Sequence, residues 1–211
     1  MSRQQASAKA NSIVVLDFET TGLSPDQGDR AIEIGAVRIE EGEVVDSFQR
    51  LMNPGRPISA FIADYTGITN DMLSDADSCE TVMEEFSGFI GESNLLAHNA
   101  SFDKRFLDAE FENISRQYRG SFLCSLLLSR RLYQDAPNHK LGTLVAYANI
   151  ESAGSYHRAL YDSEMTAKLW LSLLDDITRR FGIAEIPFEL VKKLQAVPKK
   201  SVDNFLQRWR E

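Results

Sequence analysis

Two acidic side chains interrupt an apolar run near the start of the chain. The segment IVVLDFET at residues 13–20 has Asp17 and Glu19 two positions apart among hydrophobic residues. Because side chains alternate between the two faces of a strand, both carboxylates would point the same way and Phe18 would point into the core. Two carboxylates beside a core repel each other and resist ionisation, a conflict that a divalent cation removes. The pair therefore indicates either a Mg²⁺ or Mn²⁺ site or an exposed strand end with solvated acids.

Three later residues suit the same chemistry. Asp103 falls in the first turns of a predicted helix, and Asp162 falls at the start of another, with His157 five positions before it in a loop. Carboxylates are ligands of hard cations, and a histidine can take a proton from water near neutral pH. Each has a structural alternative: Asp103 as a solvated helix acid, His157 as a surface residue and Asp162 as an N-cap. Because functional groups gather at the ends of elements, the three together favour a site.

Hydrophobic periodicity predicts the elements that would position these residues. Residues 12–20 read as a buried strand, and residues 31–54 contain two alternating segments with Gly42 at the turn, so three strands form an antiparallel meander. A helix over 77–91, with Asp77 as its N-cap, is followed by a strand over 94–98, a helix over 101–112 and a strand over 121–125. Three more helices follow over 126–133, 141–149 and 162–181. This βββαβαβ order predicts an α/β fold with one mixed sheet and helices packed on it.

The length of 211 residues allows one sizeable domain and an extension. We expect a disordered polar lead-in over residues 1–12, a catalytic domain over 13–182 and a helical C-terminal extension over 183–211. In the extension, Pro187 and Pro198 punctuate two short amphipathic helices. One apolar face would be made of Val202, Phe205, Leu206 and Trp209. This face either docks on the same domain or binds a partner protein.

The net charge of −8 argues against a protein that coats a duplex, since such proteins are usually basic. The charge is uneven: residues 1–103 hold 6 Lys/Arg and 18 Asp/Glu, whereas 104–140 hold 7 and 4. An enzyme that meets nucleic acid through bound cations can be acidic, because the metal inverts the local charge. We see no apolar run long enough for a membrane span and no export signal, so we expect a cytoplasmic protein with Cys79 and Cys124 reduced.

Three motifs carry a family resemblance. DFETTG at 17–22, HNASFD at 98–103 and HRALYD at 157–162 resemble the successive motifs of the DEDD-type 3′–5′ exonucleases, in the DEDDh subclass with histidine in the last motif. This family includes the proofreading epsilon subunit of bacterial DNA polymerase III and its stand-alone relatives. The segments IEIGAVRI, YTGIT and HKLGTLV resemble its connecting segments, and the likeness covers roughly residues 13 to 180. Cys124–Ser125 departs from the Asp-Thr or Cys-Thr pair of many relatives, at positions that are not metal ligands in the family.

The resemblance implies a ribonuclease H-like fold and a site with two divalent cations, Mg²⁺ or Mn²⁺. Asp17, Glu19 and Asp162 would hold one cation; Asp17 would also touch the second, which Asp103 would support directly or through water. Two ions roughly 3.5–4 Å apart can clamp the attacking and leaving oxygens of a phosphodiester. His157 would be the general base, so we expect activity to rise with pH as its imidazole loses a proton.

The resemblance and the residue types also indicate contacts to the 3′ end of a strand. The candidates are Thr20, Gly22, Tyr65, His98, Asn99 and Phe102. Thr20 and Gly22 would lie beside the terminal nucleotide, His98 and Asn99 would bond sugar or phosphate, and the two aromatic side chains would stack on unpaired bases. Structural alternatives are a plain strand-ending turn at Gly22, a turn hydrogen bond at Asn99 and a core position for Phe102.

The resemblance therefore predicts a metal-dependent 3′–5′ exonuclease that acts on single-stranded or frayed DNA ends and releases nucleoside 5′-monophosphates. The first alternative is an exoribonuclease that trims RNA ends with the same metals and base. A second is an inactive nucleic-acid-binding module, which the presence of every acid and the histidine disfavours. A serine hydrolase, suggested by SFDK at Ser101, lacks the companion motifs. A zinc site from His98, His139 and His157 fits no local spacing.

Overall fold

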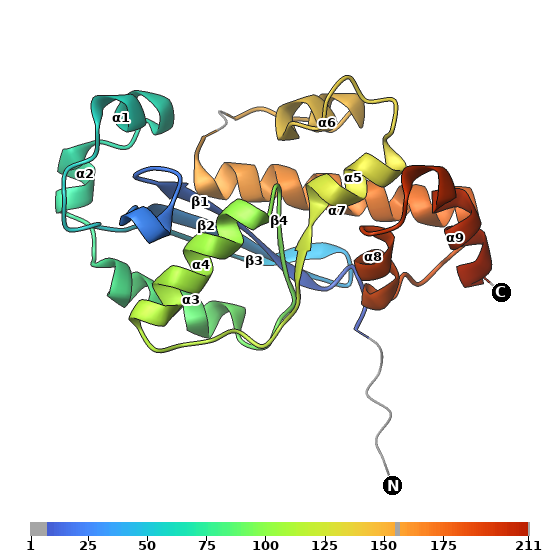
Figure 1. Cartoon of the computed structure of the whole chain (residues 1–211), viewed down its shortest axis with the longest axis horizontal. Coiled ribbons are helices and arrows are strands. Elements are labelled where there is room, and N and C mark those ends of the chain that lie inside the picture. The colour runs from blue at the N-terminus through green and yellow to red at the C-terminus, as the bar shows by residue number, and fades with distance from the viewer. Residues whose placement is uncertain (1–7, 155–156, 211) are drawn as a thin grey trace, which may run out of the picture.

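A five-stranded mixed sheet with strand order β3-β2-β1-β4-β5 organises the computed structural model, which describes residues 8–154 and 157–210 (Figure 1). The first three strands pair antiparallel, and the last two join in parallel. The strands are β1 (Ile13–Thr20), β2 (Ala31–Glu40), β3 (Glu43–Leu51), β4 (Leu95–Ala97) and β5 (Phe122–Cys124). The mixed sheet and the antiparallel opening meander agree with the fold predicted from the sequence.

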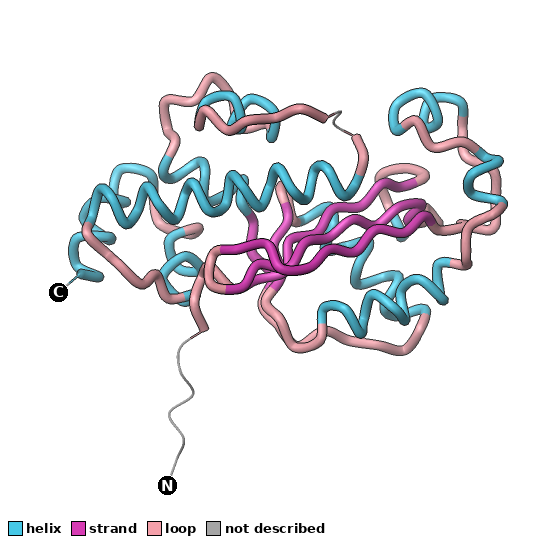
Figure 2. The backbone as a smooth tube through the Cα atoms, turned by 180° about the vertical axis from the view of Figure 1, so that it is seen from behind, coloured by secondary structure: helices cyan, strands magenta, loops and turns pink. Residues whose placement is uncertain are grey.

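Helices cover both faces of this sheet (Figures 1 and 2). Odd-numbered β1 residues such as Val15 pack with α7 and α5, whereas even-numbered ones such as Leu16 pack with α3 and α4. The central strand is therefore apolar on both sides, as its sequence indicates. The helices on these faces are α3 (Cys79–Ile90), α4 (Ser101–Asn113), α5 (Ser125–Leu132) and α7 (Ala159–Phe181), with α6 (Leu141–Tyr147) packed on α7.

Two short helices between β3 and α3 were not predicted. They are α1 (Ala60–Thr66) and α2 (Asn70–Ser74), and a 3₁₀ turn, η1 (Pro25–Gln27), follows β1. Ser59 and Thr69 cap α1 and α2, because their side chains accept hydrogen bonds from the backbone N–H of the third residue of each helix. These N-cap residues were the sequence signal from which the two helices could have been predicted, because helices of this length show little periodicity.

Two predicted helix starts need correction. Ser78, and not Asp77, caps α3, because its side chain accepts from the backbone N–H of Thr81. The long helix α7 begins at Ala159, so Asp162 lies inside its first turn and is not its N-cap. A carboxylate inside the first turn is free to face another element, which is what Asp162 does in the site described below.

The C-terminal segment packs on the same domain. It contains α8 (Phe188–Leu194), the 3₁₀ turn η2 (Lys199–Ser201) and α9 (Val202–Arg210). Val202 and Leu206 are buried in the core cluster that contains α7, and Phe205 and Trp209 are partly buried against it. The apolar face of α9 therefore docks on the same domain, the first of the two alternatives. The predicted domain boundary at residue 182 stays a prediction.

The segment before β1 also differs from the expected lead-in. Residues 1–7 lie outside the described residues, but Ala10 is fully buried and its N–H donates to the Ile186 carbonyl at 2.9 Å. The Trp170 indole donates to the Ala10 carbonyl at 2.8 Å. Its small side chain and paired backbone groups thus let Ala10 enter the core from an otherwise polar segment. Among the described residues, none of the helices is both long enough and apolar enough to cross a membrane.

Candidate active site

The carboxylates of β1 lie on the face of the sheet that α7 covers. Asp17 and Glu19 share this face with Val15, which packs against α7, whereas Phe18 is buried in the opposite cluster. In the β1–β2 pairing, Asp17 lies opposite Gly35 and Glu19 opposite Glu33. The predicted common orientation of the two acids is what the strand geometry produces.

Gly35 lets the start of α7 lie directly on β2. A Cβ at this position would fall 2.1 Å from the Leu160 backbone nitrogen and 2.2 Å from the Ala159 carbonyl carbon. The Ser163 hydroxyl donates to the Gly35 carbonyl at 2.8 Å, which fixes this close approach. The contact brings Asp162, in the first turn of α7, to the carboxylates of β1.

We expect Gly35→Ala to destabilise the fold by about 1–3 kcal/mol, the usual cost of overpacking, because the new methyl group meets the backbone of α7. The control is Gly88→Ala in α3, where nothing lies within 4 Å of the new Cβ. That change should stabilise by up to about 1 kcal/mol, since alanine is the better helix former. Urea unfolding of both variants measures this, and equal stability for the two would contradict the role of Gly35.

Asp103 reaches β1 from α4. It is 2% exposed, and its Oδ1 accepts a hydrogen bond from the Phe18 backbone N–H at 3.1 Å. The pairing of β1 with β4 ends at Val15, so the N–H of Phe18 is open to a side chain. Asp103 is therefore held beside Asp17 and Glu19, and the solvated-acid alternative is wrong for it.

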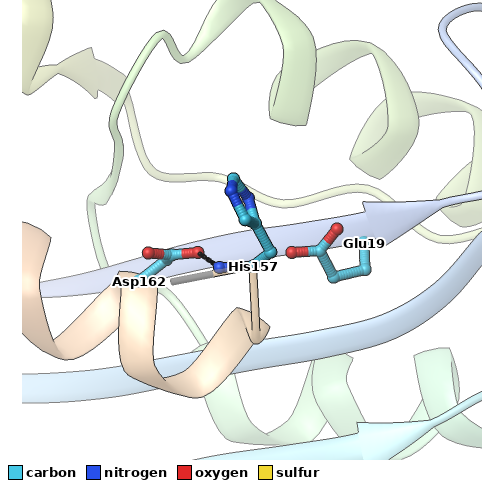
Figure 3. A group of neighbouring side chains, drawn as sticks. All are labelled: Glu19, His157 and Asp162. Atoms are coloured by element: carbon cyan, nitrogen blue, oxygen red, sulfur yellow. Dashed lines mark hydrogen bonds between the residues drawn. The ribbon is translucent and has the colours of Figure 1, made fainter. Parts of the chain in front are cut away.

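The ligand atoms of Glu19, His157 and Asp162 lie within 4.8 Å of one another (Figure 3). The His157 backbone N–H donates to Asp162 Oδ2 at 2.8 Å, in a left-handed conformation with φ of 70°. Asp162 Oδ1 is buried and has no hydrogen-bond partner among the described residues. A buried carboxylate oxygen without a donor leaves a ligand position open.

The four carboxyl groups of Asp17, Glu19, Asp103 and Asp162, called the acidic cluster below, oppose one another's ionisation. Burial, with the charges of Asp162 and Glu33 nearby, raises the pKa of Glu19 to about 8. Burial raises the pKa of Asp103 to about 7, although the Phe18 N–H opposes the shift. Burial and the neighbouring carboxylates raise the pKa of Asp17 well above its usual value, and burial raises the pKa of Asp162.

The acidic cluster fits a hard divalent cation. It offers several carboxylate oxygens, the donor type that Mg²⁺ and Mn²⁺ prefer. The unpartnered Oδ1 of Asp162 and the raised pKa values indicate carboxylates whose ionised forms the described chain compensates only in part. A bound cation would stabilise the ionised carboxylates together, which the protein alone does not.

Glu33 was not predicted from the sequence as part of the site, and it is fully buried beside Glu19. Its carboxylate accepts hydrogen bonds from the guanidinium of Arg158, the backbone N–H of Ala159 and the side-chain amide of Gln49. The available signal was an acid in the otherwise apolar strand AIEIGAV.

The structure places Thr20 and Gly22 in a tightly bonded turn. The Thr20 hydroxyl is buried and donates to the Gly22 carbonyl at 2.6 Å. A Cβ on Gly22 would fall 2.4 Å from Asp29 Oδ2. Asp29 accepts from the Thr21 hydroxyl and the Ser24 N–H, which closes the loop after β1. The need for glycine at residue 22 is thus explained by the turn itself.

His98 is bonded within the protein. Its Nε2 donates to the His139 carbonyl at 3.0 Å, and its Nδ1 accepts from the Ser125 hydroxyl at 2.8 Å. Burial lowers the pKa of His98 to about 4, so the ring is neutral at neutral pH. Both ring nitrogens are therefore used before any sugar or phosphate arrives.

The next two candidates flank the start of α4. Asn99 is exposed with φ of 66°, and its carbonyl accepts from the Phe102 N–H at 3.0 Å. Phe102 is partly buried, and its ring centroid lies 5.0 Å from that of Phe106. Asn99 thus forms the turn hydrogen bond that was the structural alternative for it. Phe102 contributes to the core, and part of its surface is exposed.

Tyr65 lies on α1 and contacts the candidate base. Its ring is 4.0 Å from the His157 ring between centroids and stacks on Phe61 at 6.0 Å and 12°. Tyr65 is 50% exposed and Phe61 is 72% exposed. Phe61 was not predicted as a candidate, although it is an aromatic residue four positions before Tyr65 and so lies on the same helix face.

The other metal site considered is not formed. Within the part of the chain that the structure describes, the one group of three side chains spaced to share an ion is that of Glu19, His157 and Asp162. His98 and His139 instead use ring nitrogens on backbone carbonyls or a hydroxyl. The zinc alternative built on three histidines therefore has no support here.

Comparisons with known proteins identify the family and the fold of this chain. The family model RNase_T, described as exonuclease, matches residues 14–170. Curated relatives include DNA polymerase III PolC-type of Bacillus subtilis (strain 168), 43% identical over 79% of this chain. The PolC-type enzyme of Halalkalibacterium halodurans is 41% identical over 81% of this chain. The chain spans only 12% of the length of each of these relatives.

Solved structures show the same fold. Exonuclease X in complex with 5′ overhanging duplex DNA has a TM-score of 0.64 and 29% identity, covering 77% of this chain and 90% of that one. The nuclease domain of 3′hExo, a DEDDh family member bound to rAMP, has a TM-score of 0.69 and 22% identity, covering 81% and 95%. The five-stranded sheet and its flanking helices are thus ribonuclease H-like, as the family resemblance implied.

Proposed function

Because the chain belongs to the exonuclease family whose model spans residues 14–170, we propose that it is a metal-dependent 3′–5′ exonuclease that releases nucleoside 5′-monophosphates from DNA. The observation that carries the proposal is the grouping of Glu19, His157 and Asp162, whose ligand atoms lie within 4.8 Å of one another. Asp17 lies close enough to be acted on by the charges of Asp103, Asp162 and Glu19. The presence of all four acids and His157 disfavours an inactive binding module.

We infer that Asp17, Glu19 and Asp162 hold divalent cations and that Asp103 supports the second site. Bound Mg²⁺ or Mn²⁺ ions would activate a water and neutralise charge on the departing 3′ oxygen. Asp103 also keeps Asp17 in place by fixing the β1 backbone at Phe18. The His157 N–H holds Asp162 Oδ2, and Asp162 Oδ1 keeps no hydrogen-bond partner among the described residues.

His157 is the proposed general base. An unprotonated imidazole nitrogen takes a proton from the attacking water, and histidine is suited to this at neutral pH. The ring is near Glu19 and Asp162 and packs on Tyr65, so it has defined neighbours on both sides. The left-handed backbone at residue 157 turns its N–H towards Asp162.

Tyr65 and Phe61 support recognition of an unpaired 3′ end. Both rings are exposed and stack on each other, and Tyr65 adjoins His157. Aromatic rings stack on bases of any sequence, at about 1–3 kcal/mol per base. The proposed substrate is DNA, because the curated relatives are DNA polymerases and Exonuclease X is bound to duplex DNA.

Single-stranded oligonucleotides labelled at the 3′ or the 5′ end test the polarity and the sugar. We expect a 3′ label on DNA to be released at once as a mononucleotide, whereas a 5′ label should appear in a ladder of shortening products. Both reactions should need Mg²⁺ or Mn²⁺ and stop with a chelator. Early release of a 5′ label, or cleavage without metal, would overturn the proposal. Faster turnover of matched RNA would make the enzyme an exoribonuclease.

A further inference from the structure

Glu33 is a buried carboxylate that the chemistry proposed above does not use. It is fully buried in β2, opposite Glu19 in β1. Its Oε1 accepts from an Arg158 terminal nitrogen and from Gln49 Nε2, each at 2.9 Å. Its Oε2 accepts from Arg158 Nε at 3.2 Å and from the Ala159 backbone N–H at 3.1 Å. Each oxygen of this carboxylate is therefore bonded twice.

This set of donors distinguishes Glu33 from the acidic cluster. A buried carboxylate is costly unless a partner and hydrogen bonds compensate it. The fork of Arg158 gives a bidentate contact, and the N–H of Ala159 adds a donor at a helix N-terminus. Asp162 Oδ1, in contrast, has no partner among the described residues. Glu33 is thus saturated by the protein and is not a metal ligand.

The two residues that Glu33 bonds at the start of α7, Arg158 and Ala159, lie between His157 and Asp162 in the sequence. Arg158 is the N-cap position and Ala159 the first residue of α7. His157 directly precedes them, and Asp162 follows within the first turn of the same helix. Glu33 therefore ties the start of α7 to β2. Its partner across the β1–β2 pairing is Glu19.

We propose that Glu33 is a positioning residue for this site: its bridge to Arg158 and Ala159 sets the placement of His157 and Asp162 relative to Glu19. This inference rests on the proposed function. Partners of metal ligands typically change metal affinity or activity 10- to 100-fold when they are lost. Glu33 would act in this way through the backbone of α7, without touching metal or substrate.

The molecule offers a matched control in Glu110. This residue is 2% exposed, and its carboxylate accepts from the guanidinium of Arg30 and from the Ala31 backbone N–H. Glu110 has the same kinds of partner as Glu33 but ties α4 to the start of β2 and makes no bond to α7. A loss that is only structural should appear in both Glu→Gln variants.

The experiment compares Glu33→Gln, Arg158→Lys and Glu110→Gln with the unchanged protein. Mn²⁺ affinity is measured by calorimetry without substrate, together with melting temperature, kcat and KM. We expect Glu33→Gln to weaken Mn²⁺ binding and lower kcat, each by about 10- to 100-fold, with KM nearly unchanged. Arg158→Lys keeps the charge but loses the fork, so it should give a smaller loss of the same kind. Glu110→Gln should lower the melting temperature alone.

The outcomes separate this inference from the proposed function. Equal Mn²⁺ affinity and equal kcat in the two Glu→Gln variants would overturn the positioning role of Glu33 and leave the exonuclease proposal intact. Failure of the unchanged protein to bind Mn²⁺ would overturn the proposed metal chemistry instead. If Glu33→Gln does not fold, Arg158→Lys decides the question, because full Mn²⁺ affinity and kcat in that folded variant would contradict the proposal.

Discussion

Changing Asp17 to alanine is expected to lower nucleotide release by more than about 1,000-fold, since even outer partners of metal ligands cost 10- to 100-fold. Asp17 lies on β1 where the charges of Asp103, Asp162 and Glu19 meet, so its loss removes the carboxylate shared by the proposed cation sites. The measurement is release of a 3′ label from single-stranded DNA at saturating Mg²⁺. Asp17→Asn, with the same shape and no charge, should lose activity to a similar extent.

The fold should survive this change. Burial and neighbouring charges raise the pKa of Asp17, so its ionised form is unfavourable in the folded protein at neutral pH. We therefore expect the metal-free melting temperature of Asp17→Asn to equal or exceed that of the unchanged protein. Cleavage retained in a folded Asp17→Ala protein would mean that the site is wrongly placed. If Asp17→Ala loses both its fold and its activity, the activity of Asp17→Asn tests the role of this carboxylate instead.

The metal-free protein is expected to lose stability as pH rises, and divalent cations should restore it. The pKa of Glu19 is raised from 4.5 to about 8 and that of Asp103 from 3.8 to about 7. The unfolded chain therefore gives up these protons first as pH rises. The stability linked to them is fully present below about pH 4 and is lost between about pH 4 and pH 8.

Calorimetry in a chelator across this range measures the effect, and Mg²⁺ or Mn²⁺ is then added at pH 8. A cation at 100 times its dissociation constant stabilises by about 2.7 kcal/mol, or roughly 5–10 °C for a chain of this size. The double variant Glu19→Gln, Asp162→Asn should show a smaller pH slope and no metal shift. An unchanged melting temperature on adding metal would contradict the assignment of the acidic cluster as a metal site.

The sequence predicted those parts of the site that depend on local periodicity. Asp17 and Glu19 share a face because a strand repeats every two residues, and this needs no knowledge of the rest of the chain. The opening meander and the long helix α7 follow from alternation and from the spacing of apolar residues. Asp103, His157 and Asp162 were predicted from the order of the three motifs, which resembles that of a known family.

Contacts between distant residues could not be predicted in this way. The bond from the Phe18 N–H to Asp103 joins residues 85 positions apart, and the bonds between Glu33 and Arg158 join residues 125 apart. The approach of α7 to Gly35 depends on the packing of helix on sheet, which no local pattern encodes. His98 shows the converse: its motif suggested ligand contact, but burial and the His139 carbonyl determine its bonding.

The segment before β1 is joined to the segment that leads from α7 into α8. The Phe188 N–H donates to the Ala8 carbonyl and the Ala10 N–H donates to the Ile186 carbonyl. This junction adjoins the beginning of β1 and the region after α7, whereas Asp17 and Asp162 lie towards the opposite ends of those elements (Figure 1). Changes that break these two backbone bonds would therefore loosen the fold at the ends of β1 and α7 that are remote from the carboxylates.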